Sequence, residues 1–117
     1  MKEYKFRLFD KVHNKYIPGG AWTLKDLIRQ DIFIDYGINN LDIEQFTGLK
    51  DDNGKELYEG DIFKLACGDN KPSKIEYPDD YYWFREYGLI DGENNELIHG
   101  VIIGNIHENP ELVSEAE

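Results

Sequence analysis

Short stretches of alternating hydrophobic and polar residues recur along the chain, and glycine, asparagine or aspartate bounds most of them. Residues 4–9 read Y-K-F-R-L-F, and Tyr16 and Ile17 resume the pattern after a polar interruption around Asn14. A period of two places successive side chains on opposite faces of a β-strand. The N-terminal pattern therefore predicts a strand, a turn and a short returning strand.

The next segment has helical spacing instead. Hydrophobic residues recur there at intervals of three and four, at Leu24, Leu27 and Ile28. Thr23 followed by Asp26 forms a partial capping box in front of this stripe. We predict a short helix over residues 24–30 and expect it to be the only substantial helix. Residues 31–40 are compatible with an irregular strand or with a loop held by its aromatic side chains.

The middle of the chain alternates strand patterns with turn signals. Residues 41–46 have a period of two, and Thr47-Gly48 ends that strand or introduces a bulge. Residues 51–54 (D-D-N-G) are a strong turn signal, because Asn-Gly accepts positive φ angles at little cost. A second turn is expected at Gly60-Asp61. The predicted strands around these turns cover residues 56–58 and 62–66.

Three further strands are predicted, at residues 74–77, 81–87 and 97–106. The second of them is rich in Tyr, Trp and Phe, which favour strands. On a strand its side chains would fall into two sets, with Tyr81, Trp83 and Arg85 on one face and Tyr82, Phe84 and Glu86 on the other. The third is predicted to be the most buried strand, with a sharp bend at its glycines.

Many short strands with glycine turns and one helix predict a mainly β fold, built as a small, strongly bent β-barrel or roll. The corner around Glu59, Gly60 and Asp61 is similar to strand openings of SH3-like barrels, so we expect an SH3-like barrel in the C-terminal part. The length of 117 residues predicts one domain over residues 1–117. Its expected parts are a β-hairpin with the short helix over 1–40, a barrel subdomain over 41–113 and a frayed tail over 114–117.

The net charge of −11 is unevenly distributed, with +4 in residues 1–30 and −15 in residues 31–117. Binding to phosphates depends on Lys and Arg, so the acidic part disfavours nucleic acid as a partner without excluding it. The early lysines and arginines that could form a local basic patch are Lys2, Lys5, Arg7, Lys11 and Lys15. We expect a soluble, cytoplasmic protein with no membrane contact, because no signal-peptide pattern and no run of about 18 apolar residues is present.

Candidate catalytic and metal-binding groups do not have the spacing that their chemistry requires. The acids near the central turns are Asp51, Asp52, Glu56, Glu59 and Asp61, and they do not match the ligand positions of a calcium-binding loop. His13, His99 and His107 have no serine or cysteine nucleophile in a recognisable context, and Cys67 lacks a basic neighbourhood that would activate its thiol. We therefore expect no catalytic residue, no metal, no cofactor and no enzymatic activity.

The best candidate for a recognition surface is the aromatic run that contains Tyr81, Tyr82, Trp83, Phe84 and Tyr87. These side chains cannot all enter one core, and exposed aromatic rings supply contact area for partners. Packing in the core, a protein contact that includes self-association, and a platform for stacking nucleic-acid bases all remain open at this point.

Three segments resemble the YopX-like proteins of bacteriophages and prophages, namely residues 6–10, 45–63 and 103–112. The matching positions are Phe46, Thr47, Gly48, Leu49, Asp51, Gly54, Tyr58, Glu59, Gly60, Asp61, Gly104, Asn105, Asn109 and Pro110. The resemblance implies a phage or prophage origin and a mainly β C-terminal domain. It also implies that these positions are a structural signature of the fold, and it supplies no molecular activity.

These observations lead to the hypothesis of a non-enzymatic phage or prophage accessory protein that acts through protein contacts. Its expected partner is a further copy of itself in a homo-oligomer, with a host or phage protein as another possibility. The alternative is a role related to nucleic acid. In one form Lys5, Arg7, Tyr82 and Trp83 bind single strands, and in the other the acidic surface imitates DNA to occupy a host factor.

Overall fold

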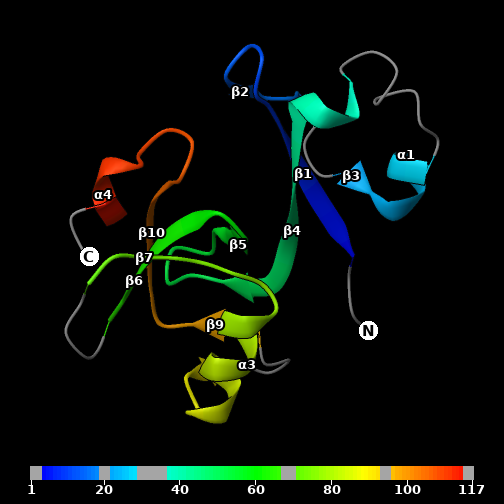
Figure 1. The fold of residues 1–117 in the computed structure, drawn as a ribbon. Coiled ribbons are helices and arrows are strands. Elements are labelled where there is room, and N and C mark those ends of the chain that lie inside the picture. The colour runs from blue at the N-terminus through cyan, green and yellow to red at the C-terminus, as the bar shows by residue number, and fades with distance from the viewer. Residues whose placement is uncertain (1–3, 19–21, 29–36, 67–70, 93–95, 115–117) are drawn as a thin grey trace. The chain divides into compact units, whose positions relative to one another are not determined.

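The computed structural model describes residues 4–18, 22–28, 37–66, 71–92 and 96–114. The chain divides into two compact units, residues 1–46 and 47–117. Strand β4 (Leu41–Lys50) begins in the first unit and ends in the second (Figure 1). The two units are described one after the other.

The first unit is built around strand β1 (Lys5–Asp10). Its antiparallel neighbours are β2 (Lys15–Tyr16), β3 (Trp22–Thr23) and the first half of β4. The predicted strand, turn and returning strand are thereby confirmed. The alternating pattern directs Leu8 into a small core, where it packs with Ile17 and Leu41.

Helix α1 (Leu24–Ile28) follows β3 directly. The predicted capping box is present, because the Asp26 carboxylate accepts the Thr23 N–H at 2.9 Å and the Thr23 hydroxyl accepts the Asp26 N–H at 3.2 Å. The last two residues of the predicted helix and residues 31–36 lie outside the described part. A short 3-10 helix, η1 (Ile38–Asn40), leads into β4.

The second unit continues β4 through Lys50, so that strand is longer than predicted and does not end at Thr47-Gly48. Within the strand, Gly48 has a positive φ of 88°, a conformation that glycine adopts easily. Strand β5 (Glu56–Tyr58) pairs with β4. Strand β9 (Leu97–Ile98) pairs with β4 in parallel and with β8 (Ile90–Asp91) antiparallel.

A separate three-stranded sheet has the order β10, β6, β7. It consists of β6 (Asp61–Leu65) between β7 (Ser73–Lys74) and β10 (Gly100–Asn105). The predicted mainly β class is confirmed, although the described residues contain several short helices where one was predicted. The strands of the described residues form mixed, open sheets, however, and these do not close into the barrel that the glycine turns suggested. The SH3-like detail stays a prediction.

The predicted strand over residues 97–106 is divided at His99 into β9 and β10. The sequence predicts a bend at the glycines, and the bend lies at His99, directly before Gly100. Gly100 itself lies close to β6. A Cβ atom on Gly100 would meet the Lys64 carbonyl oxygen and lie 2.9 Å from a ring carbon of Phe63. The prediction that this is the most buried strand was wrong, because Ile103 is exposed.

The main correction concerns residues 81–87, because residues 81–86 belong to a helix with Tyr87 as its C-cap and do not form a strand. Helix α3 (Asp79–Glu86) begins after Pro78 and has Asp79 and Asp80 in its first turn. Acidic side chains there interact favourably with the helix dipole. Phe84 is the buried residue of this helix, so the two predicted strand faces do not exist.

Helix α3 has eight residues and is longer than α1, which has five. The prediction of a single substantial helix was therefore wrong. Another short helix, α4 (Glu111–Ser114), closes the described part of the chain. Within that part, no helix has the length and apolar character needed to cross a membrane.

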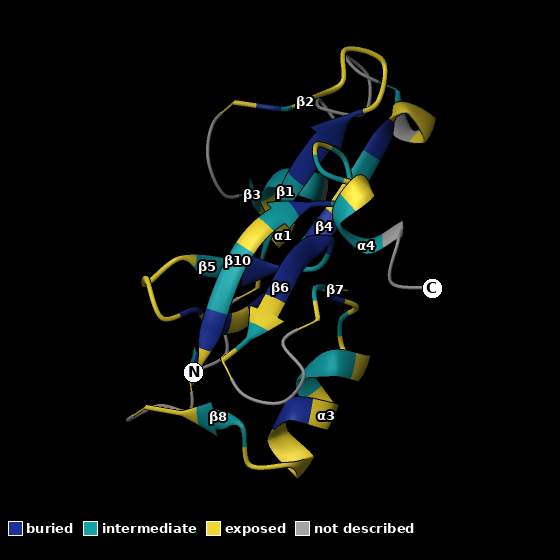
Figure 2. Cartoon of the chain, turned by 90° about the vertical axis from the view of Figure 1, so that its left-hand side faces the viewer, coloured by how far each residue is buried: buried dark blue, intermediate teal, exposed yellow. Residues whose placement is uncertain are grey.

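The core of the second unit collects one or two side chains from each of several elements. Its buried members are Leu49, Leu57, Phe63, Ile75, Phe84 and Ile98. Each such side chain contributes about 1.5–3 kcal/mol by leaving water. Phe84 is the anchor of α3 in this core, and the surface of α3 that faces away from Phe84 is exposed (Figure 2).

Candidate functional site

The candidate site is on the exposed side of helix α3. It consists of Tyr82, Trp83 and Tyr87, and we call it the aromatic face. Their exposed fractions are 59%, 46% and 64%. Tyr82 and Trp83 lie on α3, and Tyr87 is the C-cap of the helix. Of the five predicted interaction residues, these three are therefore exposed, whereas Phe84 is buried and Tyr81 packs partly against the core.

The rings around this face support each other. The Trp83 and Tyr87 ring centroids lie 4.8 Å apart at an interplanar angle of 44°. Trp83 also contacts the buried Phe84 edge to face, with centroids 5.8 Å apart. Tyr82 makes an edge contact with Tyr81 at 5.9 Å. Rings held in this way lose little conformational entropy when a partner covers them.

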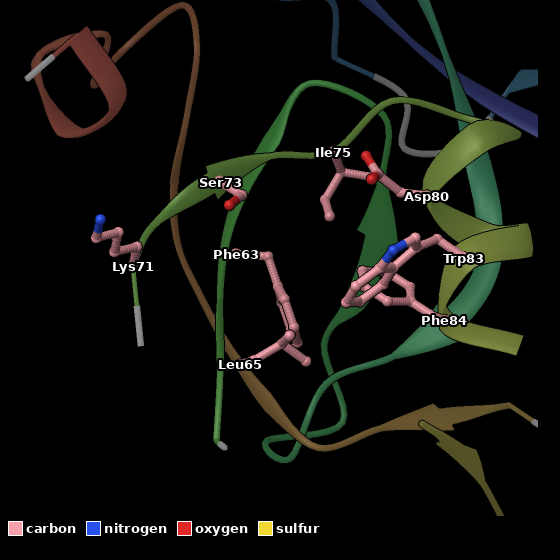
Figure 3. Close-up of a pocket in the computed structure, with 8 residues that line it drawn as sticks. All are labelled: Phe63, Leu65, Lys71, Ser73, Ile75, Asp80, Trp83 and Phe84. Atoms are coloured by element: carbon pink, nitrogen blue, oxygen red, sulfur yellow. The ribbon is translucent and has the colours of Figure 1, made fainter. Parts of the chain in front are cut away.

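A hollow of about 290 Å³ lies beside the aromatic face, between α3 and the strands β6 and β7 (Figure 3). Its lining residues are Phe63, Leu65, Lys71, Ser73, Ile75, Asp80, Trp83 and Phe84. The apolar members come mostly from the core, and Trp83 belongs to both the hollow and the aromatic face. The hollow is slightly smaller than typical small-molecule sites, which measure about 300–1,000 Å³.

Asp80 is the acidic group of this hollow. Its carboxylate accepts the backbone N–H of Glu76 at 2.6 Å, which ties the segment before α3 to the first helical turn. Burial raises the pKa of the Asp80 carboxyl, the hydrogen bond from Glu76 lowers it in part, and the charges of Glu76 and Asp79 raise it further.

The acids of the central hairpin serve the backbone. Asp51 is buried, and one of its oxygens accepts the N–H groups of Asn53 and Lys55, each at 2.9 Å. Its other oxygen accepts the N–H of Ile102 at 3.0 Å. Thr47 donates its hydroxyl to the Leu57 carbonyl at 2.7 Å. These contacts give two signature positions a structural use.

The Gly60-Asp61 corner joins several strands. The Asp61 carboxylate accepts the Tyr58 N–H at 2.8 Å. Gly60, with a φ of 89°, donates its N–H to Ile75 and accepts the Ile106 N–H at its carbonyl, each at 2.9 Å. Backbone groups of β6 and of the segments around β7 and β10 therefore meet at this glycine, which has the turn conformation that the sequence predicted.

The last signature positions form the turn after β10. The Asn105 side-chain oxygen accepts the N–H groups of His107 and Glu108, each at 3.0 Å. A Cβ atom on Gly104 would meet the Asn109 side chain. Asn105 therefore caps this strand. Pro110 is exposed next to α4.

The remaining signature residues lie along β4 and the two central turns. Leu49 is fully buried and belongs to the core, and Gly54 has a φ of 79°. Phe46 is buried and lies 4.6 Å below the Lys5 ammonium group. Glu59 is half-buried before the Gly60 corner. These placements fit a structural signature.

His99, Asp52 and Asp91 form a cluster that the sequence did not reveal, which we call the His99 clasp. His99 lies between two carboxylates, with Nδ1 3.0 Å from Asp52 and Nε2 3.2 Å from Asp91. The hydrogen bond to Asp52, and to a smaller extent the one to Asp91, raises the pKa of His99. Asp52 lies 47 positions from His99 in the sequence and Asp91 lies 8 positions from it. The three residues share no motif, so no local signal identifies the clasp.

The clasp does not have a chelating geometry, because the two carboxylates contact different nitrogens of one ring. No group of three His, Cys, Asp or Glu side chains in the described residues is arranged to hold a metal ion.

Cys67 lies outside the described part. His13 is in the predicted turn, with Nδ1 2.6 Å from the Asp10 carboxylate.

Two basic residues of the first unit lie against acidic side chains of the same unit. Arg7 forms an ion pair with Glu44 at 2.7 Å, and its guanidinium lies 4.8 Å from the centroid of the Tyr16 ring. Lys11 lies 3.6 Å from the Asp42 carboxylate. Arg7 and Lys11, two of the cations proposed for phosphate binding, are therefore paired with carboxylates.

Together, the fold and the exposed groups define a mainly β protein that presents an aromatic helix surface and uses several acidic residues to hold its turns. Residues 5–114 match the family described as YopX protein. The chain therefore belongs to the YopX family, as the sequence resemblance indicated.

A solved structure provides a comparison for the fold. The crystal structure of protein EF1440 from Enterococcus faecalis has a TM-score of 0.60 and 22% sequence identity, and the match covers 97% of this chain and 100% of that one. At this identity the likeness concerns the fold alone. A comparison with curated proteins gives no match.

Proposed function

We propose that this chain is a non-enzymatic protein-interaction module whose binding surface is the aromatic face of α3. The observation that carries the proposal is that Tyr82, Trp83 and Tyr87 are exposed on a helix whose opposite side is anchored by the buried Phe84. Exposed Trp and Tyr on a rigid element next to an apolar hollow are the usual centres of protein interfaces.

The use of the carboxylates supports a role in binding over one in catalysis. Asp51 and Asp61 are buried, and their oxygens accept backbone N–H groups within the fold. A carboxylate that holds its own turn contributes to stability, and moving it toward a substrate would break the turn.

A phage or prophage origin is part of the same proposal and is supported by membership of the YopX family. The SH3-like arrangement of residues 41–113 also belongs to it and is supported by the Gly60-Asp61 corner. Self-association would place a second copy on the aromatic face. It is the simplest protein contact that the face could make, and it requires no other component.

The first test is an affinity pull-down of the tagged chain from a lysate of a phage-carrying host, treated with nuclease. The comparison is a Tyr82→Ala/Trp83→Ala double variant, with Tyr4→Ala as the control, because Tyr4 is 53% exposed outside α3. A captured protein is then purified and titrated against all three chains.

We expect a protein that resists nuclease and whose purified form binds the original and Tyr4→Ala chains at least tenfold more tightly than the double variant. Recovery of the chain alone, with light scattering showing an oligomer that the double variant lacks, assigns the face to self-association. Equal binding to all three chains, or capture of nothing by a strict monomer, overturns the proposal.

A further inference from the structure

We infer that the segment bound by the aromatic face is basic and places an arginine or lysine against it. This inference rests on the proposed function and adds the chemistry of the partner. The observation behind it is that exposed carboxylates accompany the exposed rings along α3: Asp79 and Glu86 are exposed like Tyr82 and Trp83.

Helical spacing brings these groups together. Residues three and four positions apart are neighbours on a helix surface. Asp79 is therefore a neighbour of Tyr82 and Trp83, and Glu86 is a neighbour of the same two rings from the other direction. Each exposed ring on the helix thus has a carboxylate on either side of it, one turn away.

This arrangement attracts cations. The face of a Trp or Tyr ring attracts an ammonium or guanidinium group, and a carboxylate binds the same groups through charge-assisted hydrogen bonds. The helix carries three acids against the single cation Arg85, which gives it a net charge of −2. A guanidinium is especially well matched, because it stacks on a ring and donates to a carboxylate at the same time.

The same charges disfavour nucleic acid at this face. The carboxylates of Asp79 and Glu86 would repel phosphates beside the rings on which bases would stack. Arg7 and Lys11 of the first unit do not offset this repulsion, because they lie against the carboxylates of Glu44 and Asp42. A basic protein segment is therefore favoured over a single strand.

The hollow adds a second requirement. Phe63 and Ile75 line it with apolar surface, and Trp83 forms the boundary that it shares with the aromatic face. One apolar side chain of the partner would enter the hollow while a neighbouring cation lies on Trp83. The expected partner segment is therefore basic with at least one large apolar residue.

The test uses synthetic fluorescent peptides at low salt, with anisotropy as the readout. The first peptide has one leucine flanked by arginines with glycine and serine spacers, and the second replaces each arginine by glutamate. The chain variants are Asp79→Asn/Glu86→Gln and Tyr87→Ala. Glu111→Gln, which changes an exposed carboxylate of α4, is the matched control. Far-ultraviolet circular dichroism confirms that each variant is folded.

We expect the arginine peptide to bind the original and Glu111→Gln chains alike. The amide double variant should bind it about tenfold less tightly, and the glutamate peptide should not bind. The difference between the original chain and the double variant should shrink as salt is added. A single-stranded oligonucleotide, tested in the same way, should not bind the aromatic face.

Two outcomes overturn the inference and leave the proposed function standing. In the first, the arginine peptide loses binding on Tyr87→Ala but not on the amide double variant. In the second, neither peptide binds, although the partner from the pull-down still requires Tyr82 and Trp83. Oligonucleotide binding that is lost on Tyr87→Ala overturns both the inference and the protein-interaction proposal.

Discussion

The Asp51 carboxylate accepts a hydrogen bond from the Ile102 N–H at 3.0 Å, across 51 positions of sequence. Its other oxygen holds the hairpin turn through Asn53 and Lys55. One buried side chain therefore closes a local turn and attaches that turn to strand β10.

Replacing Asp51 by alanine should destabilise the second unit by about 3 kcal/mol, because three backbone donors lose an acceptor that is itself buried. Urea unfolding followed by circular dichroism measures the change. Asp79→Asn, on the surface of α3, should stay within about 0.5 kcal/mol of the original chain. A loss no larger for Asp51→Ala than for Asp79→Asn would contradict the structural role of Asp51.

The His99 clasp should make stability depend on pH. Both ring nitrogens face carboxylate oxygens, which only accept hydrogen bonds, so the imidazolium is the form that satisfies both contacts. Asp52 and Asp91 raise the pKa of His99. The added stability is therefore full below the ordinary pKa of 6.5 and is lost as pH rises through the raised value.

Nuclear magnetic resonance titration of the His99 ring measures this directly. The midpoint should lie above 6.5 in the original chain and move down in Asp91→Asn. The difference in unfolding free energy between the original chain and His99→Gln should also be larger at acidic than at alkaline pH. A midpoint at or below 6.5 would show that the clasp does not form in solution.

Substitutions at Phe84 and Tyr82 should have very different effects on stability, because Phe84 anchors α3 in the core and Tyr82 lies on its surface. Phe84→Ala should cost about 3–5 kcal/mol, because it removes a buried ring from the core. Tyr82→Ala removes an exposed ring and should change stability by no more than about 0.5 kcal/mol. Thermal and urea unfolding give both values, and similar costs for the two variants would disagree with the placement of α3.

Two glycines should respond differently to alanine. At Gly100 an added Cβ meets the Lys64 carbonyl and the Phe63 ring, so the β10–β6 ladder must shift. We expect Gly100→Ala to cost more than about 2 kcal/mol. Gly54 has no atom within 4 Å of an added Cβ, and its φ of 79° is the only obstacle, so Gly54→Ala should cost about 1 kcal/mol. The reverse order in urea unfolding would refute this close contact of β10 with β6.

The parts of the fold that were predictable are those determined by near neighbours in sequence. The Thr23 and Asp26 capping box and the Asn53-Gly54 turn each involve residues a few positions apart, and both are present. Family membership was likewise visible in the glycine-rich segment over residues 45–63. Local chemistry is sufficient for such features.

The errors arose where distant contacts decide the outcome. Tyr81, Tyr82 and Trp83 favour strands intrinsically. In the structure they lie on a helix, which the burial of Phe84 in the core and the acidic first turn stabilise. The sequence identified the aromatic residues of the candidate site. It did not show which of them are exposed and which are buried, because that depends on the helix. The His99 clasp joins three separate segments and was not foreseeable.

The most direct test of the aromatic face is site-specific photocrosslinking in the phage-carrying host that the proposed function implies. A photoreactive benzoyl-phenylalanine replaces Tyr87 in one chain and, as the control, Tyr4 in another; both positions are exposed tyrosines. The account predicts that position 87 crosslinks to a protein, that the product resists nuclease, and that position 4 gives no such product. Equal crosslinking from the two positions, or a nuclease-sensitive product at position 87, would contradict the assignment of the aromatic face as a protein-binding surface.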